Sequence, residues 1–136
     1  MKRIAIVLEK NLTAGQTANV SGILMGQAAL LVPELYDLSP VFDCDGQMHA
    51  AIMYSTVILS AGAGQLLNLC KNVGGSNPNI SCISFSQIGQ GLHNKYDEYK
   101  TLISSAATDI TKPVGVILVG DDEEIRILTR KYSLFR

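Results

Sequence analysis

The middle of this 136-residue chain contains no lysine or arginine. Every basic residue lies at or before Lys10 or at or after Lys71, and the formal net charge of the whole chain is -1. The charged side chains between these two lysines are all acidic: Glu34, Asp37, Asp43 and Asp45. Because a phosphate backbone is held mainly by lysine and arginine, the sequence argues against RNA or DNA as a partner.

Cysteine and histidine are also scarce, and neither stands at the spacing of a known site. The chain has three cysteines, Cys44, Cys70 and Cys82, with no C-x-x-C pair among them. Their odd number and wide spacing predict reduced, buried thiols of a cytoplasmic protein. The two histidines, His49 and His93, accompany no G-x-S-x-G motif. We therefore expect no metal ion and no cofactor, and the sequence identifies no catalytic residue.

Charged residues make up only 17% of the chain, against 47% hydrophobic residues. This length fits one domain, residues 1–136, and the small supply of charge for its surface predicts a homo-oligomer, most simply a dimer. The apolar run that follows Arg3 ends at Glu9 and is too short for a signal peptide. Two uncharged windows, residues 11–33 and 50–70, are rich in polar residues and glycine, so we expect no membrane span.

Strand-like and helix-like segments alternate along the chain. Apolar and β-branched runs predict strands at residues 4–8, 54–59, 80–85 and 113–119. Helical spacing predicts helices from Thr13 to the residue before Pro33, at 61–72, at 94–107 and after Gly120-Asp121. This alternation predicts a single α/β domain whose one sheet is mostly parallel or mixed, with helices on both faces.

The first predicted helix has two distinct stripes. Thr13 and Gln16 fit the capping-box pattern that starts a helix. The core stripe is Val20, Leu24, Ala28 and Leu31, and the neighbouring stripe of small residues is Ala18, Gly22, Gly26 and Ala29. A glycine inside a helix costs about 1 kcal/mol relative to alanine, so the two glycines indicate close approach of a sheet, a helix or a ligand.

Residues 36–53 carry turn signals rather than a long periodic pattern. Asp45-Gly46 favours a hairpin between Val41-Phe42 and residues 48–52. The rest of this stretch is left open by the sequence. A second glycine-rich stretch, residues 74–78, predicts a loop.

Uncharged polar side chains gather where the first strand ends and the first helix begins. Ligands of open α/β sheets bind at this edge, where free backbone N–H groups favour anions. Ser86 and Gln87 leave the end of another strand, so the two polar groups converge if those strands are neighbours. The predicted ligand-binding residues are Thr13, Gln16, Asn19, Ser86 and Gln87. The alternative is that these side chains are helix caps and solvated polar groups.

Two further motifs are better explained without a ligand. The acidic run Asp121 to Glu124 stands at a predicted helix start, where negative charge complements the helix dipole, which makes a metal site unnecessary. Gly89-Gln90-Gly91 lacks the third glycine and the G-K-[ST] ending of a phosphate-binding loop.

Several stretches together carry a resemblance to a known family: residues 2–22, 33–35, 43–46, 96–99 and 113–136. Over essentially its whole length the chain resembles the bacterial family known as domain of unknown function two thousand. The resemblance implies a fold similar to that of peptidyl-tRNA hydrolase II, and it implies no established activity.

The likeness to the hydrolase fails at its functional residues. That family leaves its first strand through N-[DE]-L and opens a helix with G-K-G-K-M-A-A-Q, whereas this chain has Asn11-Leu12 and then residues 15–22. Gln16 stands where the family has its functional lysine, and Gln87 stands where it has an aspartate. Because glutamine neither carries a proton near neutral pH nor neutralises a phosphate, the substitutions argue against peptidyl-tRNA as substrate.

Three hypotheses for function follow. The first is a non-catalytic or differently catalytic relative of the hydrolase, which binds a small polar ligand or a protein partner. The second is a hydrolase or transferase on an acyl ester or amide, in which Gln16, Asn19 and Gln87 orient the carbonyl and His93 or Asp97 is the base. The third is a structural subunit whose small-residue stripe lies in an oligomer interface.

Overall fold

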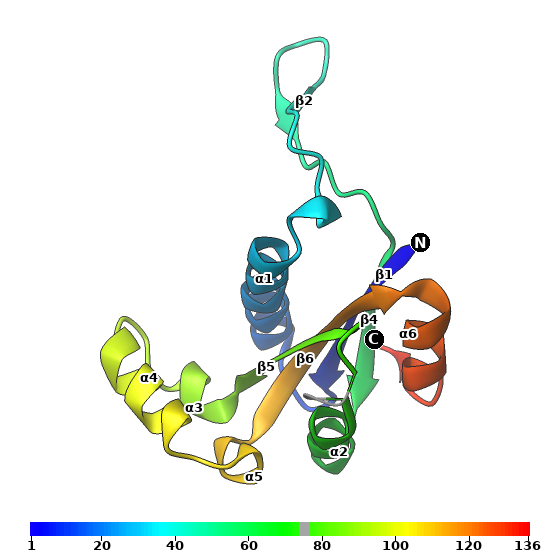
Figure 1. Ribbon diagram of the computed structural model, residues 1–136. Helices are drawn as coiled ribbons and strands as arrows, with labels where there is room; N and C mark the ends of the chain where they lie inside the picture. The colour runs from blue at the N-terminus through cyan, green and yellow to red at the C-terminus, as the bar shows by residue number, and fades with distance from the viewer. Residues whose placement is uncertain (74–76) are drawn as a thin grey trace.

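A five-stranded sheet forms the centre of the protein (Figure 1). The computed structural model describes residues 1–73 and 77–136, so Gly74, Gly75 and Ser76 of the predicted 74–78 loop lie outside the described residues. The strand order is β5-β6-β1-β4-β7. The strands are β1 (Lys2–Glu9), β4 (Thr56–Ala61), β5 (Ser81–Ser86), β6 (Pro113–Asp121) and β7 (Ser133–Leu134).

The sheet is mixed, and most of its pairings are antiparallel. Strand β1 pairs in parallel with β4, but β6 runs antiparallel to both of its neighbours, β1 and β5, and β7 runs antiparallel to β4. The prediction of a mixed α/β sheet is confirmed, and the prediction of a mostly parallel one is wrong. Residues 87–112 connect β5 to β6 at one end of these two strands, so β6 runs antiparallel to β5.

The helices of that return segment do not cross a face of the sheet. Helix α4 (Tyr96–Ser104) lies within the predicted 94–107 helix and is shorter, and two further short helices, α3 (Gln87–Gln90) and α5 (Thr108–Thr111), flank it in the segment (Figure 1). Helix α4 has no buried residue. It therefore does not cover the sheet as a crossover helix would.

Each face of the sheet carries its own apolar core. Helix α1 (Ala14–Leu31) covers one face through Val20, Leu24 and Ala28, as predicted, whereas Leu31 is 59% exposed at the last turn. Helices α2 (Ala63–Val73) and α6 (Asp122–Thr129) cover the other face. The buried leucines of α2 are Leu66 and Leu69, while Leu67 is only partly buried. Helices on both faces are thus confirmed.

The segment between α1 and β4 projects from the body as an arm, which we define as residues 36–53 (Figure 1). It follows the short helix η1 (Pro33–Leu35) and contains the predicted hairpin of β2 (Val41–Phe42) and β3 (Met48–His49). At its base, the amide of Asp37 donates to the carbonyl of Ala51 and the amide of Met53 to that of Leu35, both at 2.9 Å.

The three thiols are free, but they are not all buried. Cys70 and Cys82 are partly buried against the core under α2, where burial raises the pKa of both thiols, that of Cys82 to about 12. Cys44 lies exposed at the tip of the arm, in a hairpin whose two strands are themselves exposed. The prediction of a buried thiol is therefore wrong for Cys44.

Among the described residues, no helix combines the length and the apolar character that crossing a membrane requires.

Candidate functional site

A groove of about 600 Å³ lies between the flank of α1 and the segment that follows β5. One wall is formed by side chains of α1, the floor by β5, and the opposite wall by α3, the following loop and the start of α4. The polar and aromatic residues that line the groove include Asn19, Gln27, Phe85, Gln90, Tyr96 and Tyr99. Its volume falls within the range of small-molecule sites, about 300–1,000 Å³.

Three aromatic rings form a row along this groove. The Phe85 and Tyr99 ring centroids are 6.5 Å apart, those of Tyr96 and Tyr99 are 6.4 Å apart, and both pairs are close to parallel. Gly89 makes this row possible, because a Cβ atom there would lie 2.5 Å from Cε1 of Phe85 and 3.0 Å from Cε1 of Tyr99. The row offers flat apolar surface at the mouth of the groove, where Tyr96 is 67% exposed.

Uncharged carboxamides line the same groove. Asn19 and Gln27 come from α1, Gln90 from α3, and Asn94 from the loop before α4. Within the described residues none of these four side chains has a hydrogen-bond partner. A carboxamide both donates and accepts hydrogen bonds, so the groove can recognise a neutral polar group without a proton transfer.

The other two predicted residues at the start of α1 are occupied by the helix itself. The backbone amide of Gln16 donates to Oγ1 of Thr13 at 3.3 Å, and the amide of Thr13 donates to Oε1 of Gln16 at 3.0 Å. This reciprocal pair is the predicted capping box. Of the three residues predicted on this helix, only Asn19 therefore presents a free side chain to a cleft.

The two predicted residues after β5 point to different places. Ser86 is buried, and its Oγ accepts from the amide of Gly89 at 3.3 Å as the cap of α3. Gln87 lines a second cleft of about 480 Å³ at the end of β1. Strand β6 separates β5 from β1, so the five predicted residues do not meet at one point. Their role in binding stays a prediction.

We call this second cleft the edge cleft, since it lies where β1 ends and β6 begins. Asn11 reaches it but is held by Glu9, whose carboxylate accepts from the Asn11 amide at 2.9 Å and from its Nδ2 at 3.1 Å. Lys112 stands there with φ of 57°, a left-handed conformation that is strained for lysine. Its carbonyl accepts from the amide of Gln87 at 2.9 Å, which joins the starts of α3 and β6.

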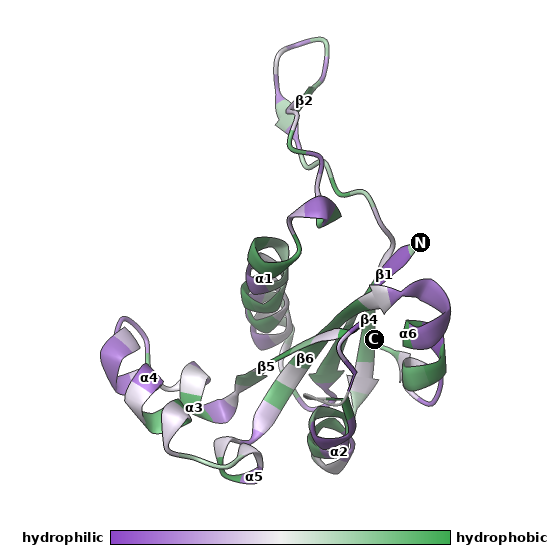
Figure 2. Cartoon of the chain, in the orientation of Figure 1, coloured by the Kyte–Doolittle hydropathy of each residue, from purple (hydrophilic) through white to green (hydrophobic). Residues whose placement is uncertain are grey.

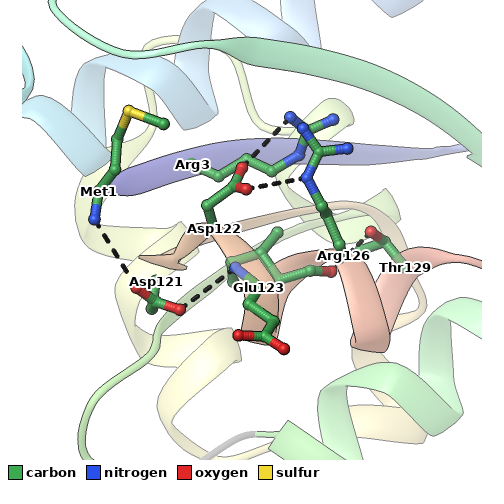
Figure 3. Close-up of polar contacts among 8 residues, drawn as sticks. Met1, Arg3, Asp121, Asp122, Glu123, Arg126 and Thr129 are labelled. Atoms are coloured by element: carbon green, nitrogen blue, oxygen red, sulfur yellow. Dashed lines mark hydrogen bonds and ion pairs between the residues drawn. The ribbon is translucent and has the colours of Figure 1, made fainter.

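The acidic run at the start of α6 is held by ion pairs and a helix cap (Figure 3). Asp121 caps the helix by accepting from the amide of Glu123 at 3.2 Å. Asp122 accepts from Nε of Arg126 at 2.9 Å and lies 3.6 Å from Nη1 of Arg3. These guanidinium groups, Arg126 first, hold the pKa of Asp122 below its usual value. No three His, Cys, Asp or Glu side chains among the described residues cluster as a metal site would require.

The two histidines lie in separate regions. His93 lines the groove. His49 is on the arm, where its Nε2 lies 2.8 Å from Oδ2 of Asp43, and this contact lowers the pKa of the aspartate. Only His93 can therefore act on a molecule bound in the groove.

Several residues of the groove are not identified by the sequence alone. The helical spacing of residues 94–107 predicts a helix but does not point Tyr96 and Tyr99 to a site, and no sequence motif singles out Gln27 or Phe85. The available signal is the presence of aromatic and carboxamide residues together in residues 85–99.

The comparisons with known proteins place the chain in a family. The family model described as protein of unknown function (DUF2000) matches residues 2–136. The chain belongs to this family. A solved structure of a protein of unknown function from Agrobacterium tumefaciens superimposes with a TM-score of 0.84 at 19% identity, over 99% of this chain and 98% of that one. At this identity the likeness shows a shared fold. No curated protein matches the chain.

Proposed function

We propose that this member of the DUF2000 family is a small-ligand-binding domain whose ligand occupies the groove between α1 and α4. The observation that carries the proposal is the combination, in one cleft of about 600 Å³, of three aligned aromatic rings and four carboxamides that have no hydrogen-bond partner in the described part of the chain. Small-molecule sites combine apolar surface with a few convergent polar groups in this way.

The lining indicates the chemical class of the ligand. A flat ring can stack on Tyr96 or Tyr99, and an uncharged polar substituent can reach the carboxamides of Asn19 and Gln90. The described residues that line the groove include no aspartate or glutamate, and the lysine among them is Lys95. The class that fits best is therefore a neutral aromatic or heteroaromatic molecule that bears an amide-like group.

A hydrolase or transferase receives less support from the geometry. In that hypothesis Gln16, Asn19 and Gln87 act on one carbonyl, yet Gln16 is engaged in the cap and Gln87 lines the edge cleft. Asn19 and His93 do share the groove. A reaction in the groove would therefore have to use these two residues without Gln87, which removes the resemblance to the hydrolase site.

The proposal is tested with benzamide as a probe, followed by amide and side-chain carboxamide signals in two-dimensional NMR spectra. We expect benzamide to shift the signals of Asn19 and Gln90 in a saturable manner. Cyclohexanecarboxamide, which carries the same amide on a ring that is not flat, should bind more weakly.

Matched variants locate the binding. Tyr99→Leu removes a ring from the row and should weaken benzamide binding about two- to tenfold, the value of one aromatic contact of about 0.5–1.5 kcal/mol. Gln87→Ala, in the edge cleft, should leave binding unchanged. Shifts confined to the edge cleft, or equal binding of the two probes, would contradict the proposal.

A further inference from the structure

The arm exposes apolar side chains that no other described residue of the chain covers. Every residue from 37 to 50 is exposed. The exposed large hydrophobic side chains of the arm are Leu38, Val41, Phe42, Met48, Ile52 and Met53, with Leu38 at 89% and Met48 at 57%. An isolated two-stranded hairpin is marginally stable in water, so a hairpin with this composition requires a partner surface.

The shape of the arm is nevertheless specified in detail at its tip. Oδ1 of Asp43 accepts from the amides of Asp45 and Gln47, both at 3.0 Å, and its Oδ2 contacts His49. Gly46 takes φ of 84°, which closes the turn. The tip is thus preorganised before any partner is bound, which reduces the entropy lost on docking.

A second unpartnered apolar surface lies on α1. We define its outer face as Ala18, Gly22, Ile23, Gly26 and Leu30, all exposed and none charged. Leu30 is 75% exposed, and a Cβ atom on Gly22 or Gly26 would meet no atom within 4 Å. Figure 2 shows hydrophobic residues along much of α1. An exposed apolar stripe on a helix is normally covered by another element.

The arm cannot cover α1 of its own chain without losing its base. It leaves the C-terminal end of α1 and continues away from the body (Figure 1). The hydrogen bonds between Asp37 and Ala51 and between Met53 and Leu35 fix that direction. Folding back onto the same α1 would require a different conformation at this base.

Composition and charge fit the arm to α1 of a second copy. The arm exposes Leu38, Val41, Phe42 and Met48, and the outer face of α1 exposes Ile23 and Leu30. The arm carries acidic Asp37, Asp43 and Asp45 and no lysine or arginine. Next to the outer face, the wall of the groove that faces α1 carries Lys95.

We propose that two copies of this chain form a reciprocal dimer in which the arm of each docks on the outer face of α1 of the other. One twofold axis satisfies both unpartnered surfaces of both copies at once. The open sides of Gly22 and Gly26 then allow the partner's hairpin to approach the helix closely. This inference does not depend on any ligand in the groove.

Sedimentation velocity of the full chain tests the proposal, with three single variants. The wild type should sediment as a dimer. Phe42→Asp on the arm and Leu30→Glu on α1 should each shift the population to monomer, with circular dichroism unchanged because both side chains are exposed. Ile127→Glu, which places the same charge on an exposed site of α6, should remain dimeric.

Mixing distinguishes arm exchange from other dimers. An equimolar mixture of the Phe42→Asp and Leu30→Glu chains should associate more tightly than either alone, because one arm contact in the mixed dimer is intact. Where a variant loses its circular dichroism signal, Phe42→Ala or Leu30→Ser replaces it. A monomeric wild type would overturn the proposal. Dissociation by only one of the two substitutions would also overturn it, since it would indicate α1 against α1 or arm against arm.

Discussion

Helix α1 covers one face of the sheet and helix α6 helps to cover the other, and only α6 presents charge to the solvent. Helix α6 begins with three acidic residues and pairs Asp122 with Arg126 one turn later. Helix α1 has no acidic residue in its first turn and no basic residue in its last turn. Figure 2 shows strongly purple turns at the start of α6, whereas green predominates in α1.

The two helices therefore differ in the kind of side chain that they present outward. Both helices bury their inward residues fully, as Leu24 does at 1% exposure and Ile125 at 0%. The outward residues of α6 include charged side chains, whereas those of α1 are uncharged and include the apolar Ile23 and Leu30. Three substitutions, given in order of decreasing effect, sharpen or break this contrast.

The largest effect is expected under α1. A Cβ atom on Gly115 would lie 2.7 Å from Cγ1 of Val20 and 2.9 Å from Cδ2 of Leu8, so Gly115→Ala should destabilise the protein by about 1–3 kcal/mol. The matched change on the other face, Gly120→Ala, meets Ile80 at 3.1 Å and should cost less. Urea unfolding of both variants measures the difference. Equal costs would mean that α1 packs no more closely than α6.

A smaller effect of opposite sign is expected on the outer face of α1. Gly22→Ala introduces no clash within the chain and removes a glycine from a helix interior. It should raise the free energy of unfolding of the single chain by up to about 1 kcal/mol, measured in dilute solution by urea titration. If arms dock there, the added methyl group should at the same time weaken dimerisation. A loss of stability in the single chain would show that the outer face is already covered.

The smallest effect is expected at α6 and depends on pH. Because the pKa of Asp122 is lowered from its ordinary value of 3.8, its stabilisation is complete above that value. This stabilisation is lost as the pH falls through the lower pKa that Asp122 has in the folded state. Asp122→Asn should thus have a smaller free energy of unfolding than the wild type at pH 7, and the difference should narrow as the pH falls below about 4.

Urea titrations over a pH series measure this gap. Glu123→Gln, which removes one negative charge from the same turn without an ion pair in the described part of the chain, serves as the control. A gap that persists at pH 2 would show that Asp122 acts through packing rather than through its charge.

Local signals in the sequence predicted most of the elements. The capping box of Thr13 and Gln16, the apolar run of β1 and the Asp45-Gly46 turn each specify their structure through neighbouring residues. The direction of β6 could not be predicted this way. It depends on where residues 87–112 travel, and a helical pattern alone does not say whether a helix crosses the sheet or stays at its edge. Strand β7, with only two residues, carries no periodic signal.

The candidate site was only partly predictable for the same reason. Asn19 lies beside a cleft, at the start of a helix that follows a strand, which is a local feature of the sequence. Its role in binding stays a prediction. The convergence of Ser86 and Gln87 with Asn19 assumed that their strands are neighbours, and β6 lies between them. The row of Phe85, Tyr99 and Tyr96 arises from a fold of the chain at Gly89 that periodicity does not encode.

Residues 87–112, which connect β5 to β6, line the groove but do not take part in the apolar cores. Neither apolar core contains any residue from 87 to 112, yet this segment supplies one whole wall of the groove. Substitutions in the segment can therefore change the lining of the groove while both cores keep their residues, except at Gly89, where a side chain would meet Phe85. Under the proposed function, ligand preference can diverge through this segment while the sheet and its two cores stay the same.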